Sequence, residues 1–142
     1  MGADNNGADK VHEAAQSSKY RNDIFFTGHF PSATLPELYS GADIVVIPSM
    51  YEGFGMGVLE AMASGVPVIC ARAGSLPETA NHSALYFDPQ NSEEMADRMV
   101  TMTSDREMYR ECRRLGLERV QMFSWDRCAA ETMRVIHEIT GK

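Results

Sequence analysis

The feature that most constrains the fold is an apolar run, Asp43–Pro48 (DIVVIP), which leads into a loop with three glycines in five positions, Gly53–Gly57. The run does not alternate between apolar and polar residues, so it predicts a strand covered on both faces, as in a parallel sheet. A helical segment, Val58–Ser64, follows and ends at Gly65. A second apolar run, Pro67–Ala71, predicts the next strand. This order of elements is typical of α/β proteins.

The rest of the chain continues the alternation of strands and helices. Short β-rich runs stand at Ile24–Thr27 and Leu85–Phe87, and helical patterns at Val11–Ser18 and Leu35–Gly41. Three further helices are predicted after residue 91, capped by Ser92, Asp105 and Ser124. We therefore expect an α/β fold with a Rossmann-like parallel sheet and flanking helices. Ligands bind beyond the carboxyl ends of the strands in such sheets, which points to the glycine-rich loop.

Composition limits the partners. The 142 residues carry a net charge of −7, which disfavours nucleic acid and allows membrane contact at most peripherally, because both attract basic surfaces. No apolar stretch is long enough to span a bilayer. Three widely spaced cysteines without metal-ligand spacing predict reduced thiols, no structural metal and a cytoplasmic location.

The glycine-rich loop has the properties of an anion site. Glycines leave backbone N–H groups uncovered, and these groups lie at the start of the helix Val58–Ser64, where about four donors lack internal partners. The positive end of the helix dipole adds to the attraction, so a phosphate or diphosphate suits this position. The loop is neither a Walker A motif nor a dinucleotide-binding fingerprint, since it lacks the spacing of both.

Two glutamates flank this loop. Glu52 stands at its start and Glu60 about one turn into the helix, with seven residues between them. A carboxylate beside an anion is unfavourable unless it binds hydroxyl groups, for which it is a strong acceptor. The arrangement therefore fits a ligand with a diphosphate in the middle and a sugar at each end.

These residues resemble a known family. The stretch from Tyr51 to Ile69 is similar to the signature of the retaining GT-B glycosyltransferases of group 1, or family 4, whose hallmark is two glutamates separated by seven residues. The blocks Ile24–Gly28, Leu38–Tyr39, Ala42–Ser49, Gly74–Glu78 and Phe123–Trp125 match the family in the same order, so the resemblance covers roughly residues 20–135.

The resemblance implies roles for the matching residues. Glu52 is expected to be catalytic, binding hydroxyls of the transferred sugar near the reacting carbon, and Glu60 to bind the ribose. The donor sugar and diphosphate would contact the backbone of Gly53, Phe54, Gly55 and Met56. The base would lie near Gly28, His29 and Phe30. The substrate would be a nucleotide diphosphate sugar, with no cofactor and no metal.

The sequence departs from the family pattern in two respects. Gly57 stands where the family usually has proline, and the Arg and Lys that neutralise the diphosphate have no match in residues 1–19. We therefore expect residues 1–19 to be a flexible leader or the remnant of a helix, and residues 20–142 to be a partial nucleotide-sugar-binding domain. This domain would be the C-terminal half of a GT-B fold without its first strands, and it would need an N-terminal acceptor domain or a separate subunit.

Three functional hypotheses follow. The first is transfer of a hexosyl group with retention at the anomeric carbon, by this chain together with its other half. The second is a non-catalytic nucleotide-sugar-binding module or an inactive fragment. The third, a GT-B epimerase or phosphorylase, is the weakest, because no lysine is placed for pyridoxal phosphate.

Overall fold

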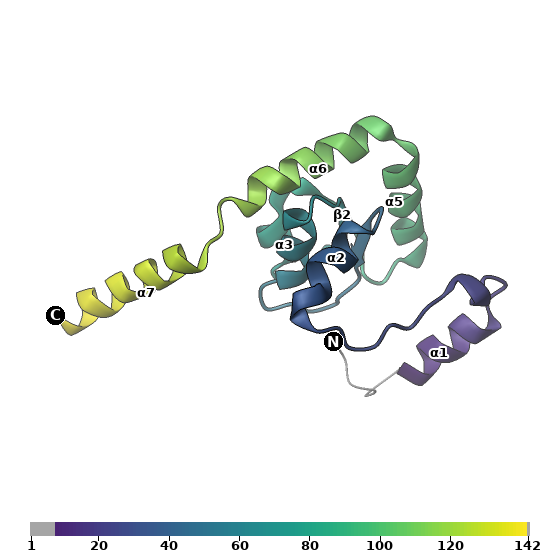
Figure 1. Cartoon of the computed structure of the whole chain (residues 1–142), viewed down its shortest axis with the longest axis horizontal. Helices are drawn as coiled ribbons and strands as arrows, with labels where there is room; N and C mark the ends of the chain where they lie inside the picture. The colour runs from purple at the N-terminus through teal and green to yellow at the C-terminus, as the bar shows by residue number, and fades with distance from the viewer. Residues whose placement is uncertain (1–7, 142) are drawn as a thin grey trace. The chain divides into compact units, whose positions relative to one another are not determined.

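The computed structural model describes residues 8–141, and the chain divides into two compact units, Met1–Leu35 and Pro36–Lys142 (Figure 1). In the first unit, helix α1 spans Ala8–Ser17, and the short 3-10 helices η1 and η2 span Arg21–Asp23 and Ser32–Thr34. Helix α1 confirms the helical pattern predicted at Val11–Ser18. Residues 1–7 of the predicted leader lie outside the described residues.

The strand predicted at Ile24–Thr27 is wrong. Ile24 has extended backbone angles, but the segment pairs with no other strand among residues 8–141. Extended chain becomes a strand only when a neighbour takes up its hydrogen bonds. The apolar side chains of this segment are also exposed, with Phe25 at 80%.

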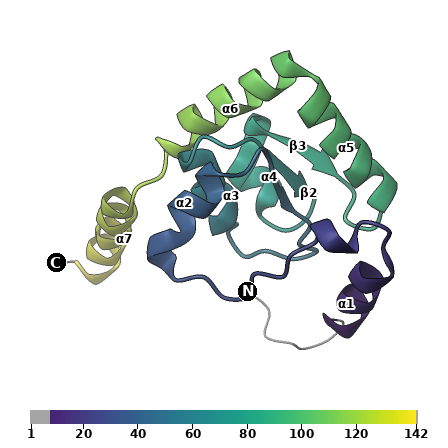
Figure 2. The same cartoon turned by 45° about the vertical axis from the view of Figure 1, so that its right-hand side comes forward.

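The second unit is built on a parallel sheet of three strands in the order β1-β2-β3, namely β1 (Val45–Ile47), β2 (Val68–Ala71) and β3 (Ala84–Phe87) (Figure 2). Helix α2 (Leu35–Ser40) precedes β1, and helix α3 (Met56–Ala63) connects β1 to β2. Helix α4 (Leu76–Ala80) and the short η3 (Asn81–Ser83) connect β2 to β3. The alternation of parallel strands with helices confirms the predicted α/β fold.

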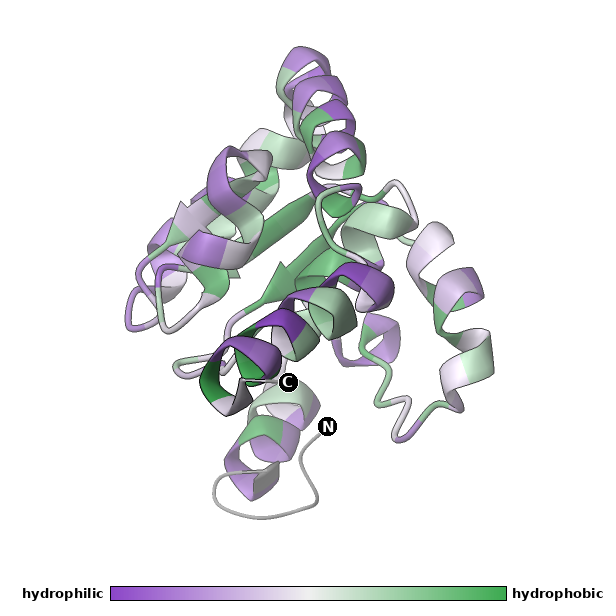
Figure 3. Ribbon diagram, turned by 90° about the vertical axis from the view of Figure 1, so that its left-hand side faces the viewer, coloured by the Kyte–Doolittle hydropathy of each residue, from purple (hydrophilic) through white to green (hydrophobic). Residues whose placement is uncertain are grey.

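Three longer helices complete this unit: α5 (Ser92–Ser104), α6 (Arg106–Val120) and α7 (Trp125–Thr140). Helix α5 packs against β3, and α6 runs along α3 (Figure 1). The strands are among the most hydrophobic segments (Figure 3), and the core includes Val58, Met62, Ile69, Leu76, Phe87 and Met102. Helix α7 buries none of its residues, and Trp125 is 77% exposed.

Strand β1 is less covered than its sequence predicted. Its residues Val45–Ile47 are only partly buried, whereas all four residues of β2 are buried. The reason is its position, because among the described residues β1 pairs with β2 on one side and with no strand on the other. The prediction of cover on both faces is therefore met only in part at β1, whose three residues pack against the core without being fully buried, and is confirmed for β2.

The helix ends follow local chemistry. Asp105 and Ser124 cap α6 and α7 as predicted, each accepting hydrogen bonds from backbone N–H groups of the first turn. The cap predicted at Ser92 is wrong, since the side chain of Asn91 accepts from the Glu94 N–H and Ser92 is already helical. Asparagine is as good a cap as serine, and here it has the extended backbone that a cap requires.

Candidate functional site

The glycine-rich loop lies between the end of β1 and the start of α3. Gly55 immediately precedes the helix with a left-handed backbone, φ 88°, and a Cβ there would lie 3.0 Å from Leu76 Cδ2. Only glycine meets both conditions without strain. No side chain of the described residues caps the N-terminus of α3. The Val58 N–H donates to the Gly55 carbonyl at 3.0 Å, which leaves the N–H groups of Met56 and Gly57 for a ligand.

Close packing against the segment after β2 holds the backbone of Glu52. The Glu52 carbonyl accepts from the Ser75 N–H at 3.2 Å and from the Ser75 hydroxyl at 3.0 Å. Gly74 has φ 54°, and a Cβ on it would lie 2.7 Å from the Glu52 carbonyl oxygen and 2.9 Å from its nitrogen. Real Cβ atoms do not come this close, so the position of Glu52 depends on the absence of a side chain at Gly74.

The carboxylate of Glu52 is also held. The Ser49 hydroxyl donates a hydrogen bond to Glu52 Oε1 at 2.8 Å, and the glutamate is partly buried. Ser49 stands two residues after the end of β1, so a residue close to the strand end holds the side chain of the loop glutamate. The second carboxylate oxygen has no hydrogen bond to any described residue and can accept one from a ligand.

A second set of contacts ties the loop to α4 and to the end of α6. The Thr79 hydroxyl donates to the Phe54 carbonyl, and the Phe54 ring meets Phe123 edge-on with centroids 5.9 Å apart. Arg119 lies over the Phe123 ring and donates to the carbonyls of Thr79 and Glu78. The side chains of Phe54 and Met56 and the backbone of Gly53 are open to solvent.

Glu60 lies one turn into α3 and is partly buried. The Tyr39 hydroxyl donates to Glu60 Oε2 at 3.1 Å, and burial, followed by the charge of Glu60 and this hydrogen bond, raises the pKa of Tyr39. Among residues 8–141, neither Glu60 nor Glu52 forms an ion pair. Two carboxylates without cationic partners, one at each end of an uncapped helix start, can accept hydrogen bonds from hydroxyl groups of a ligand.

Gly28, His29 and Phe30 belong to the first unit. Gly28 has a left-handed backbone, φ 65°, His29 is exposed, and Phe30 is partly buried. Nothing tests their predicted closeness to the base, which stays a prediction.

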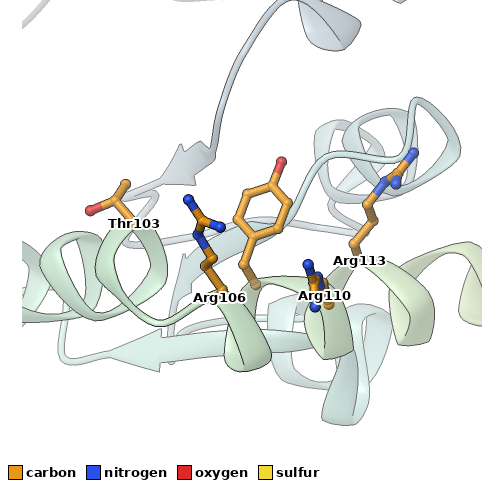
Figure 4. A pocket seen from close by; sticks show the side chains of 5 residues that line it. Thr103, Arg106, Arg110 and Arg113 are labelled. Carbon is orange, nitrogen blue, oxygen red and sulfur yellow. The ribbon is translucent and has the colours of Figure 1, made fainter.

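Three arginines that stand close together in the sequence of α6, namely Arg110, Arg113 and Arg114, differ in their surroundings. Arg114, on the α6 surface, pairs with Glu111 and Glu118 at 2.6 Å each. Arg110 and Arg113 instead line a hollow of about 360 Å³ together with Thr103, Arg106 and Tyr109 (Figure 4). The hollow lies along the last turn of α5 and the first half of α6, and neither glutamate of the loop lines it.

Residues 8–141 contain neither a candidate membrane span nor a cluster of potential metal ligands. No helix in this range is both long and apolar enough for a bilayer crossing. No group of three or more His, Cys, Asp or Glu side chains gathers there as potential metal ligands.

Comparison with known proteins decides the family. The family described as glycosyl transferases group 1 matches residues 1–119. The chain belongs to this family. Among group 1 relatives, O-antigen chain mannosyltransferase B from Escherichia coli is 36% identical over 78% of the chain. The D-inositol 3-phosphate glycosyltransferase of Corynebacterium glutamicum is 34% identical over 87% of the chain. The chain spans 29% and 30% of these two proteins.

Solved structures give the same family and establish the GT-B fold. Sucrose-phosphate synthase from Thermosynechococcus elongatus superposes with a TM-score of 0.85 at 29% identity, over 94% of this chain and 34% of that one. The Anabaena protein HepE in complex with UDP gives a TM-score of 0.73 at 26% identity, over 90% of this chain and 36% of that one. The chain thus has a Rossmann-like fold of the GT-B type and corresponds to about a third of the length of those structures.

Sequence reasoning found the loop and both glutamates but missed the residues that hold them. Tyr39, Ser49, Gly74, Ser75 and Thr79 all contact the loop or its carboxylates. Four of them stand within blocks that resemble the family, but nothing in their spacing indicates a partner more than 20 residues away. Only Ser49, three residues before Glu52, is close enough in the chain for the contact to be guessed.

Proposed function

We propose that this chain is the donor-binding part of a retaining hexosyltransferase, which transfers a hexosyl group from a nucleotide diphosphate sugar to an acceptor. The observation that carries the proposal is the placement of two carboxylates around the start of α3, beyond strand β1. Glu52 lies in the loop before this helix and Glu60 one turn into it, and no described side chain caps the helix between them. A diphosphate fits between them against the backbone N–H groups of Gly55 to Gly57. The sugar then lies on the side of Glu52 and the ribose on the side of Glu60.

The chemistry follows from the same geometry. The bond between the anomeric carbon and the diphosphate oxygen breaks, a bond forms between that carbon and the acceptor hydroxyl oxygen, and negative charge develops on the leaving diphosphate, which takes up the acceptor's proton. Backbone donors and the helix dipole of α3 stabilise that charge without a metal ion. Glu52, held by Ser49, accepts hydrogen bonds from sugar hydroxyls next to the reacting carbon and orients it. Glu60 contributes binding rather than chemistry.

Relatives support the donor class. HepE was solved with UDP and with UDP-glucose, and the Escherichia coli relative is named as a mannosyltransferase. The acceptor is assigned to a second GT-B domain or a separate subunit. A cytoplasmic location belongs to the same proposal, supported by three cysteines that form no disulfide.

Transfer is tested with the whole protein and a panel of labelled UDP-, GDP- and ADP-hexoses. The proposal predicts a product whose anomeric configuration by NMR matches that of the donor, with a rate unaffected by EDTA. The Glu52→Gln variant should lose most of this rate. An inverted product would refute retention, and a rate abolished by EDTA would refute the metal-free mechanism.

A binding module without transfer activity is the alternative. The resemblance implies an Arg and a Lys beside the diphosphate, and residues 1–19 show no match for this pair. This alternative predicts nucleotide binding without any transfer by the whole protein, so the same panel distinguishes the two.

A further inference from the structure

Tyr39 reaches the Glu60 carboxylate from an element 21 residues earlier in the chain. It stands near the end of α2, and its hydroxyl donates to Oε2 of Glu60 at 3.1 Å. We propose that Tyr39 is a positioning residue, which fixes the Glu60 carboxylate so that its other oxygen meets the ribose diol of the donor. This inference rests on the ribose-binding role proposed for Glu60.

The contact suits this task. A glutamate side chain rotates freely about its last bond, which has broad preferences, so an unheld carboxylate presents either oxygen in many orientations. A tyrosine has only two side-chain torsions, and Tyr39 is partly buried and packs against the core. Its hydroxyl therefore acts as a fixed donor that engages Oε2 alone. Since no ion pair occupies Glu60 within residues 8–141, Oε1 stays available to a ligand hydroxyl.

Two further observations agree with this role. A tyrosine hydroxyl is protonated at neutral pH in any case, and burial, the charge of Glu60 and the hydrogen bond raise the pKa of Tyr39 further, so the hydroxyl can donate. Gly57 lies on the same face of α3 as Glu60, three residues before it, and a Cβ on Gly57 would stand 3.5 Å from the Tyr39 hydroxyl and 3.6 Å from Ile47 Cδ1. The glycine thus leaves the space beside the hydroxyl unfilled, at the helix turn that separates the diphosphate site from Glu60.

Tyr39 also packs against the core, so the test must separate positioning from simple packing. We would measure binding of UDP, GDP and ADP to the chain by calorimetry, and then compare the best ligand with its 2′,3′-dideoxy analogue. The unsubstituted chain should prefer the ribose form, and Glu60→Gln should abolish that preference. Tyr39→Phe should reduce the preference about tenfold, as expected for loss of a hydrogen bond to a charged group, and leave affinity for the dideoxy analogue unchanged.

Tyr109→Phe is the matched control, because Tyr109 is another partly buried tyrosine of this unit that packs against the core, but its side chain lines the hollow of α5 and α6 and is not hydrogen-bonded to Glu60. It should leave the preference intact. Suppose that Glu60→Gln removes the preference for the ribose form, but Tyr39→Phe lowers the affinity for both ligands equally or for neither. Tyr39 is then not a positioning residue, and the ribose-binding role of Glu60 stands. If Glu60→Gln keeps the preference, or no nucleotide binds, the proposed function itself fails.

A second measurement needs no ligand. Because Glu60 contributes to the raised pKa of Tyr39, Glu60→Gln should lower that pKa in a titration of the tyrosine ring carbons by NMR. An unchanged pKa would contradict the contact from which the inference is drawn.

Discussion

The Gly74→Ala variant tests whether the loop carrying Glu52 sits as close to the segment after β2 as the structure shows. An alanine at this position would keep a left-handed backbone at φ 54°, which costs about 1–2 kcal/mol for a residue with a Cβ. The new Cβ would also lie 2.7 Å from the Glu52 carbonyl oxygen and 2.9 Å from its nitrogen. These are backbone atoms, so the loop must move by several tenths of an ångström.

That movement disturbs the two hydrogen bonds from Ser75 to the Glu52 carbonyl, each of which contributes roughly 1 kcal/mol. Loss of one or both of these bonds, added to the backbone cost, lowers the free energy of unfolding by about 2–4 kcal/mol. For a chain of 142 residues, 1 kcal/mol corresponds to about 3 °C in Tm, so calorimetry should show a fall of about 6–12 °C.

Gly57→Ala is the matched control within the same site. A Cβ at Gly57 meets its nearest neighbours at 3.5 and 3.6 Å, which is ordinary contact, and its φ is not positive. Replacing this helical glycine should raise stability by about 0.5–1 kcal/mol. If Gly74→Ala proved as stable as Gly57→Ala, the close approach at Glu52 and the reasoning built on it would be refuted.

Three further predictions concern a helix cap, a buried thiol and the Glu52 carboxylate. Asn91→Ala should lower the free energy of unfolding, measured with urea, by about 1 kcal/mol, and Ser92→Ala should hardly change it, because Asn91 makes the cap. A larger loss in Ser92→Ala would show that Ser92 is the cap, as the sequence predicted. Burial raises the pKa of Cys70 from 9.0 to about 12. The buried, protonated thiol therefore contributes fully to the free energy of unfolding below pH 9, and this contribution is lost as pH rises toward 12. Stability measured at pH 8 and at pH 10.5 should therefore differ less in Cys70→Ala, and an equal difference would exclude this thiol as a cause. Ser49→Ala should slow transfer by the whole protein about tenfold at unchanged affinity for the nucleotide diphosphate, since Ser49 holds only the Glu52 carboxylate; a loss of affinity alone would contradict the division of roles.

The local signals in the sequence were sufficient for most elements of the second unit. Apolar runs located β1, β2 and β3, and a small polar residue before each helical stripe located α6 and α7 by their caps. Such features depend on a few neighbouring residues, so they can be predicted without tertiary contacts. Where two adjacent residues can both cap, as Asn91 and Ser92 can, composition does not decide between them.

The errors have a different origin. The apolar run Ile24–Thr27 has the composition of a strand, but a strand needs a neighbour, and that depends on the rest of the sheet. The apolar run at β1 predicted cover on both faces, but cover depends on which elements lie beside the strand.

The candidate site also combines features that neighbouring residues predict with features that depend on tertiary contacts. The loop and both glutamates are readable because glycines, a helix start and two carboxylates stand within nine residues of the chain. The hydrogen bond from Tyr39 to Glu60 and the close approach of Gly74 to Glu52 join segments 21 and 22 residues apart. Only the folded arrangement of α2, α3 and the segment after β2 brings these residues together.

The central claim is that the loop from Glu52 to Glu60 binds a nucleotide diphosphate, and thermal unfolding of the chain with UDP, GDP and ADP tests it most directly. A ligand at about 100 times its dissociation constant stabilises the folded state by about 2.7 kcal/mol, or about 8 °C here. We predict a shift of this size with one of the three nucleotides, lost in Glu60→Ala. A cooperative transition that no nucleotide moves, or a shift that survives Glu60→Ala, would contradict the account.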